Sequence, residues 1–345
     1  MYRKLIILAA LLTFCVVVLG AYVRLSDAGL GCPDWPGCYG HITPAHAAEH
    51  IAAAEAVQPH GPVSLPKAWK EMVHRYFAST LGFLIIGIAA IAWFRRRTLK
   101  QSPTLPIALI GLVIFQGLLG MWTVTLLLKP VIVTAHLFGG LSLLALLTVL
   151  ALRQFKGGLS IAVVAPRSLQ WLAVAGFVVL VTQIGLGGWV STNYAALACS
   201  DFPLCQGVLM PKMDFGNAFH VVRELGMTAQ GDLLSLEALT AIHWMHRVGA
   251  VVTSIVLGVL TCCLFRVGGG RGLGVMLLSG LVLQLLLGIG NIYLQLPLAL
   301  AVAHNAGAAL LVVILVVVNF ALRRVPSGAQ HSVIEPSRAM ASIQV

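Results

Sequence analysis

Four histidines are the residues of this chain whose type and spacing most directly suggest chemistry. His136 and His304 are 168 residues apart, and His74 and His246 are 172 apart. Each lies close to the start of a long apolar run. Imidazole is the commonest metal ligand among protein side chains. The spacing therefore predicts two pairs of ligands, one in each half of the chain, with hydrogen-bonded packing of the rings as the alternative.

The donor set favours haem over a zinc or copper ion. At the depth of the histidines, the two halves share no cysteine or carboxylate, whereas zinc and copper sites take three or four protein donors. A haem in a four-helix bundle needs only two axial nitrogens. Arg75 and Arg247 directly follow His74 and His246. Their guanidinium groups would either pair with haem propionates or contact lipid headgroups.

The two halves differ in one residue beside these ligands. Glu71 stands three residues before His74, whereas His243 stands three residues before His246. Spacing of three residues puts both side chains on the same helical face. An acid beside only one pair indicates that one half reacts and the other holds a fixed cofactor. The alternative is a carboxylate that is favoured by the positive end of its helix.

The composition predicts an all-α integral membrane protein. Of 345 residues, 59% are hydrophobic and 10% are charged, and the mean hydropathy is +0.94. The first apolar run follows MYRK and lacks a clean cleavage site, so we interpret it as a retained helix and not as a signal peptide. Apolar runs long enough to span a bilayer predict eight transmembrane helices: 5–24, 74–94, 104–127, 131–152, 169–191, 238–265, 273–294 and 298–322.

The basic residues predict the orientation of these helices. Cytoplasmic loops are enriched in lysine and arginine, and the net charge of +11 is therefore a sign of topology and not of nucleic-acid binding. Both termini are predicted to be cytoplasmic, with a disordered tail at 326–345, and the loops 25–73 and 192–237 to be external. A short helix is expected near 44–56. The basic residues that share one side are Arg3, Lys4, Arg95, Arg96, Arg97, Lys100, Arg153, Lys156, Arg266, Arg271, Arg323 and Arg324.

An internal repeat divides the chain. GAYVRLSDAGLGCPDWPGCYG at 20–40 aligns without gaps to GGWVSTNYAALACSDFPLCQG at 187–207, and Gln116 matches Gln284 further on. Repeats of an even number of helices insert with the same orientation. The chain is therefore predicted to consist of two four-helix bundles, 1–157 and 158–325, related by an axis along the membrane normal.

Two cysteine pairs lie in the predicted external loops, Cys32 with Cys38 and Cys199 with Cys205. An oxidising exterior suits disulfides, which would staple the loops. The alternative is that one pair exchanges electrons with a partner. The five-residue spacer in each pair is wider than in common zinc knuckles.

The segment GAYVRLSDAGLGCPDWPGC, the motif EMVHRY and the four histidines together resemble the haem A synthase family, in its bacterial form, over residues 1–325. The resemblance implies oxidation of a ring methyl group of haem O to a formyl group, by way of an alcohol and a geminal diol, to give haem A for cytochrome oxidase. It also implies a disulfide between Cys32 and Cys38, and Cys199 and Cys205 would form a second pair.

The resemblance assigns a role to each half. His246 and His304 would be the axial ligands of a haem b, with Arg247 beside them, and the N-terminal half would bind the substrate haem. There, His74 and His136 would surround the iron, Arg75 would bind the haem, and Glu71 would be the catalytic acid. The haem sites would lie near the periplasmic face of the bacterial inner membrane.

Two other functions are compatible with parts of the sequence. An electron-transfer cytochrome b with two haems would need no acid, and a transporter built from repeats would have polar residues near the bilayer midplane. Haem O synthase as a partner and a homo-oligomer are compatible with haem A synthesis, but no motif indicates either, or the electron donor. Six further histidines match no motif: His41, His46, His50, His60, His220 and His243.

Overall fold

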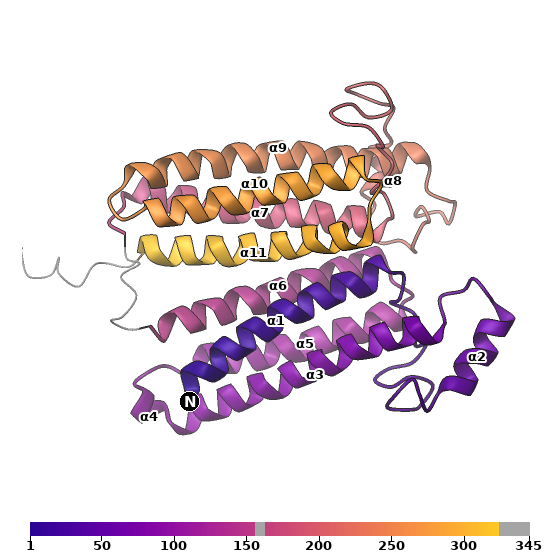
Figure 1. Ribbon diagram of the computed structural model, residues 1–345, viewed down its shortest axis with the longest axis horizontal. Helices are drawn as coiled ribbons and strands as arrows, with labels where there is room; N and C mark the ends of the chain where they lie inside the picture. Colours follow the sequence, from indigo (N-terminus) through magenta and orange to yellow (C-terminus); the bar gives the residue numbers. More distant parts are fainter. Residues whose placement is uncertain (156–162, 324–345) are drawn as a thin grey trace, which may run out of the picture.

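The computed structural model describes residues 1–155 and 163–323, and eight long apolar helices run through this part of the chain (Figure 1). The predicted tail at 326–345, Lys156 and Arg324 lie outside the described residues. The eight helices are α1 (Tyr2–Leu25), α3 (Leu65–Phe94), α5 (Thr104–Thr125), α6 (Pro130–Arg153), α7 (Arg167–Thr192), α9 (Leu236–Arg266), α10 (Arg271–Tyr293) and α11 (Leu298–Arg323). Three short helices join them: α2 (Ala48–Val57), α4 (Arg96–Leu99) and α8 (Phe215–Ala218).

The eight predicted spans are confirmed as helices, and one boundary was wrong. The second span was predicted to start at residue 74, but α3 begins at Leu65, with Pro66 in its first turn. Proline fits the first turn of a helix because its missing N–H has no partner there. The hydropathy of this stretch is lowered by Lys67, Lys70 and Glu71. A prediction based on apolar runs therefore placed the start of the helix too late. His74 therefore lies well inside a helix, not at its start.

The long helices form two groups of four that lie side by side (Figure 1). In the first group, α1 packs on α3, α3 on α5, α5 on α6, and α6 back on α1. In the second group, α7, α9, α10 and α11 close a ring in the same order. Helices α3 and α6 are therefore diagonally opposed in the first ring, and α9 and α11 in the second.

Each group packs around its own apolar core. In the first group, Ile6, Ile85, Ile88 and Leu147 are nearly inaccessible to solvent. In the second group, the core is richer in leucine: Leu257, Leu260, Leu264, Leu277 and Leu315. Since lipid is as apolar as these side chains, such packing acts through close contact and not through exclusion of water.

The two groups meet along α1, α6, α7 and α11. At the end that carries the long loops, Nη2 of Arg24 donates to the Ser191 carbonyl at 2.6 Å, and the Tyr194 hydroxyl donates to Asp27 at 2.9 Å. Both contacts join residues 167 positions apart, which is the offset of the repeat. Residues on a two-fold axis contact their own equivalents, so these contacts support the predicted relation between the halves.

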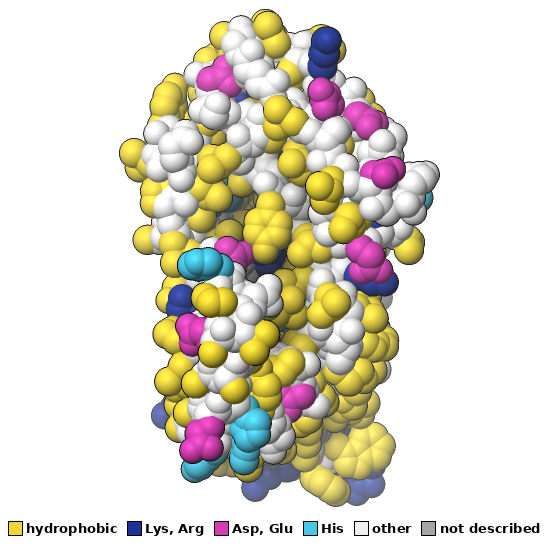
Figure 2. All heavy atoms as spheres, turned by 90° about the vertical axis from the view of Figure 1, so that its right-hand side faces the viewer, with side chains coloured by type: hydrophobic (Ala, Val, Ile, Leu, Met, Phe, Trp, Pro, Cys, Tyr) yellow, Lys and Arg dark blue, Asp and Glu magenta, His cyan; other side chains and the backbone are white. Residues whose placement is uncertain are grey.

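The end of the molecule that carries the long loops is acidic. Figure 2 looks onto this end, where acidic and histidine side chains are spread over the surface. The loop from α1 to α3 contains α2, as predicted, and the loop from α7 to α9 contains α8. Apart from Glu335, which lies outside the described residues, the acidic residues belong to these loops or to the helical turns beside them: Asp27, Asp34, Glu49, Glu55, Glu71, Asp201, Asp214, Glu224, Asp232 and Glu237.

Candidate haem sites

The structure brings the four predicted ligands together in two pairs. His74 on α3 and His136 on α6 come from diagonally opposed helices of the first group, and each is within electrostatic range of the other. His246 on α9 and His304 on α11 are related in the same way in the second group. All four side chains are half-buried.

A glycine on the neighbouring helix lies against each ring. A Cβ atom added to Gly20, Gly187 or Gly288 would lie 3.0 Å from Cε1 of His74, His246 or His304 respectively. At Gly120, the distance to Cε1 of His136 would be 3.4 Å. A larger residue at the first three positions would force the ring to move, so these glycines let each ring pack closely on the backbone of its neighbour.

These surroundings fit a haem. Nδ1 of His74, His136 and His304 is closed off from solvent and has no hydrogen-bond partner, although buried polar atoms normally have one. Within residues 1–155 and 163–323, no group of three or more His, Cys, Asp or Glu side chains is arranged to hold a metal ion. Two imidazoles in each bundle match a haem iron, whose remaining ligands come from the porphyrin.

Glu71 lies one helical turn before His74 and is 4% exposed. Its Oε2 accepts a hydrogen bond of 2.9 Å from the main-chain amide of Cys32, and its Oε1 forms an ion pair with Arg75. A buried carboxylate needs such partners because the loss of hydration is costly. The acid is therefore held in one position between α3 and the first external loop.

His243 occupies the equivalent place in the second half, where it is 5% exposed. The amide of Cys199 lies 3.3 Å from its Nδ1, and Nε of Arg247 lies 3.3 Å from its Nε2. Neutral imidazole accepts through one nitrogen only, so His243 can satisfy one of these donors where Glu71 satisfies both. Glu71 and His243 therefore contact equivalent groups, a loop amide and an arginine, but they differ in charge and in the number of hydrogen bonds that they can accept.

The two arginines contact the disulfide loops. Nη1 of Arg75 donates to the carbonyls of Asp34 at 2.9 Å and Gly37 at 2.6 Å. Arg247 donates to the carbonyls of Leu204 at 2.7 Å and Cys199 at 2.8 Å. These contacts anchor each loop above the histidines. The predicted contact of the arginines with haem propionates stays a prediction.

Both disulfides form, as predicted. The Cα atoms are 4.9 Å apart in Cys32–Cys38 and 4.7 Å apart in Cys199–Cys205. In the second loop, Asp201 accepts the amides of Gly207 at 2.8 Å and Gln206 at 2.7 Å. These hydrogen bonds, the one from Gly207 above all, lower the pKa of the Asp201 carboxyl below its ordinary value of 3.8.

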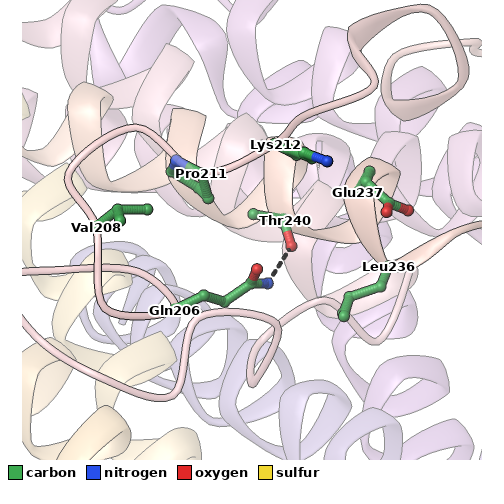
Figure 3. A pocket seen from close by; sticks show the side chains of 7 residues that line it. All are labelled: Gln206, Val208, Pro211, Lys212, Leu236, Glu237 and Thr240. Carbon is green, nitrogen blue, oxygen red and sulfur yellow. Dashed lines mark hydrogen bonds between the residues drawn. The ribbon is translucent and has the colours of Figure 1, made fainter.

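A small surface pocket lies in the second external loop, on the N-terminal turns of α9 (Figure 3). Nε2 of Gln206 donates to the hydroxyl of Thr240 across it at 2.9 Å. None of the four candidate ligands lines it, so it does not belong to the haem sites. The residues that line it are Gln206, Val208, Pro211, Lys212, Leu236, Glu237 and Thr240.

Comparison with known families covers nearly the whole chain. A sequence model of the COX15-CtaA family, described as cytochrome oxidase assembly protein, matches residues 3–316. The chain belongs to this family. The resemblance that the sequence motifs indicate is therefore confirmed.

Several curated COX15-CtaA relatives carry the name Heme A synthase. The protein of Shewanella oneidensis is 42% identical over 311 residues, which cover 90% of this chain and 93% of the relative. The protein of Caulobacter vibrioides is 28% identical over 339 residues, which cover 92% of this chain and 94% of the relative. That of Halalkalibacterium halodurans is 27% identical over 270 residues, which cover 76% of this chain and 83% of the relative.

Two glutamines in this COX15-CtaA chain contact the candidate ligands and were not predicted as site residues. Nε2 of Gln183 lies 3.0 Å from Nδ1 of His246, and Nε2 of Gln284 lies 3.3 Å from Nε2 of His304. Gln284 served only as a marker of the repeat. A search for polar side chains at the depth of the histidines would have found both, because amides are rare in long apolar runs.

Proposed function

We propose that this COX15-CtaA protein acts in haem A biosynthesis and oxidises a ring methyl group of haem O to the formyl group of haem A. The names of its relatives support the pathway. The observation that carries the reaction is the buried carboxylate of Glu71, which stands beside the His74 and His136 pair and is replaced by His243 in the other half.

In the N-terminal half, His74 and His136 would bind the iron of the substrate haem. Two successive hydroxylations and loss of water would convert the methyl to the formyl group. With dioxygen as the oxidant, R–CH3 + 2 O2 + 4 e− + 4 H+ gives R–CHO + 3 H2O, so protons must reach a site with little access to water. Glu71 would pass them on at its carboxylate oxygens, which Arg75 and the Cys32 amide already orient. A fixed carboxylate costs little reorganisation during the reaction.

In the C-terminal half, His246 and His304 would hold a haem b as resident cofactor. When bound, this haem would supply electron transfer. His243 brings no fixed negative charge to this half, so the half lacks the carboxylate that would pass protons to a reacting substrate. Both sites would lie toward the loop-bearing end of the eight helices, which we propose is the periplasmic face of the inner membrane.

The experiment is a co-expression of each variant with a source of haem O, followed by chromatography of the extracted haems. Glu71→Ala should leave the protein folded and loaded with haem but unable to make haem A. His243→Ala, the matched change in the other half, should still make it. Normal haem A from Glu71→Ala would remove the acid from the mechanism and favour an electron-transfer cytochrome with two haems.

A further inference from the structure

The amide of Gln183 connects α7 to the candidate ligand on α9. Its Nε2 lies 3.0 Å from the ring nitrogen Nδ1 of His246 and donates to the His246 carbonyl at 3.0 Å. Its Oε1 is buried and has no hydrogen-bond donor. This contact joins a polar side chain of one helix to both the side chain and the backbone of the ligand.

The same contact is repeated between α10 and α11. Nε2 of Gln284 lies 3.3 Å from Nε2 of His304 and donates to the His304 carbonyl at 3.1 Å. Its Oε1 is also buried without a donor. Each ligand of the C-terminal pair is therefore in contact with a glutamine, at Nδ1 of His246 and at Nε2 of His304.

Each glutamine fits against a glycine of the ligand helix. A Cβ atom on Gly249 would overlap the amide oxygen of Gln183, and one on Gly307 would overlap that of Gln284. Both glycines stand three residues after the ligand. Gln116 packs against Gly139, three residues after His136, but with its amide nitrogen, which is buried without a hydrogen-bond partner.

His74 differs from the other three ligands in having no glutamine beside it. The glutamines stand four residues before the glycine that touches each ring, and the residue in that place before Gly20 is Val16. The residue three positions after His74 is Phe77, not glycine. The side chain of Val16 cannot form a hydrogen bond, so it offers His74 no amide. Nδ1 of His74, like that of His136 and His304, is buried without a partner.

A hydrogen bond to the outer nitrogen of a metal-bound imidazole fixes the ring and strengthens the ligand. An imidazole that binds iron through one nitrogen keeps a proton on the other. Rotation of the amide by half a turn would bring the unpartnered Oε1 of Gln183 to that N–H, in exchange for the Nε2 hydrogen bond to the His246 carbonyl. Loss of such an outer partner typically weakens metal binding about 10- to 100-fold.

We propose that Gln183 and Gln284 are positioning residues that keep His246 and His304 on a permanently bound haem, and that His74 is the exchangeable ligand of the substrate site. This inference rests on the proposed function, since it assumes a resident haem and a substrate haem. Gln116 packs against the helix of His136, whereas no glutamine stands beside His74, so the ligand beside Glu71 is the one that can leave. Such an arrangement suits a site whose haem must enter and depart.

The test is carbon monoxide binding to the reduced, haem-loaded protein, because carbon monoxide binds only where an axial ligand has left. In the unmodified protein, the N-terminal haem should react and the C-terminal haem should not. Gln183→Leu should make the C-terminal haem reactive, with binding about 10- to 100-fold faster, or release that haem while the N-terminal haem stays bound. Gln183→Glu, which keeps an acceptor oxygen, should restore the original behaviour.

The double variant Val16→Gln with Phe77→Gly supplies the missing partner and should slow carbon monoxide binding at the N-terminal haem by a similar factor. The inference is wrong if the Gln183→Leu protein retains its C-terminal haem with unchanged carbon monoxide binding, or if the double variant reacts like the unmodified protein. Haem content, measured as the pyridine complex, separates the two proposals: an unmodified protein that binds no haem would contradict the proposed function itself.

Discussion

The main-chain amide of Cys32 donates a hydrogen bond of 2.9 Å to Oε2 of Glu71. This contact joins the first disulfide loop to the proposed catalytic acid on α3. Because Arg75 binds both Glu71 and the carbonyls of the same loop, the position of the carboxylate depends on the loop. The loop should therefore affect the reaction without touching the iron.

We expect the double variant Cys32→Ser with Cys38→Ser to retain haem and to lose activity. Without the disulfide, the Cys32 amide is no longer held at the carboxylate, and displacement of a catalytic group commonly costs up to about 100-fold in rate. The measurement is the ratio of haem A to haem O, together with the haem content of the purified protein.

The matched control opens the other loop. Cys199→Ser with Cys205→Ser releases the loop above His243 and should change the haem A ratio much less. Equal losses in the two double variants would mean that the disulfides act on folding or haem delivery in general and not through Glu71.

His246→Ala should abolish the low-spin haem spectrum of the C-terminal half, because one of two axial nitrogens is removed. The optical spectrum and electron paramagnetic resonance of the purified protein report the change. His220→Ala, in the exposed part of the second loop, is the control and should leave the spectrum intact. An unchanged low-spin signal in His246→Ala would overturn the assignment of this ligand.

The helices could be predicted from sequence because apolar length is a strong signal. The start of α3 could not, since its first turns are charged and extend beyond the apolar run. Lys67 and Lys70 look like loop residues in a hydropathy profile, yet Ser64 and Pro66 are typical of a helix start. Capping residues would have placed this boundary better than hydropathy.

The pairing of the histidines could be predicted because the repeat places them in register, but the contacts around them could be predicted only in part. The spacing of four between Glu71 and Arg75 allows a helical ion pair, but the binding of Arg75 to the Gly37 carbonyl depends on the loop conformation. The repeat could not predict Gln183 as a site residue because its equivalent in the first half is Val16. A comparison of the two halves shows the residues that they share, whereas Gln183 is a residue in which they differ.

The lowered pKa of Asp201 lets us predict how the stability of the second loop changes at low pH. Its pKa is lowered by the amides of Gly207 and Gln206, so the ionised carboxylate favours the folded loop at pH values above its ordinary 3.8. This contribution is lost as the pH falls through the lower value of the folded state. The difference in thermal unfolding midpoint between the unmodified protein and Asp201→Asn should be constant near neutral pH and shrink below about pH 4.

Glu55→Gln on the surface helix α2 is the control for the loss of one negative charge. It changes one acidic group of the other external loop and shows how much of the effect comes from a change of net charge alone. A gap between Asp201→Asn and the unmodified protein that narrows already between neutral pH and about pH 5 would contradict the lowered pKa.

The close approach of Gly187 to His246 gives a final prediction. A methyl group at position 187 would lie 3.0 Å from Cε1 of the ring, closer than atoms normally pack, so Gly187→Ala must push the imidazole aside. We expect altered electron paramagnetic resonance g values for the C-terminal haem and a shifted midpoint potential.

Gly258→Ala on α9 is the control for Gly187→Ala. It adds the same group where nothing lies within 4 Å, and should leave both the g values and the potential unchanged. Because alanine favours a helix over glycine by about 0.5–1 kcal/mol, both variants should still fold. If the two gave the same spectrum, the ring could move without effect on ligation, and the glycine contact would have no role in holding it.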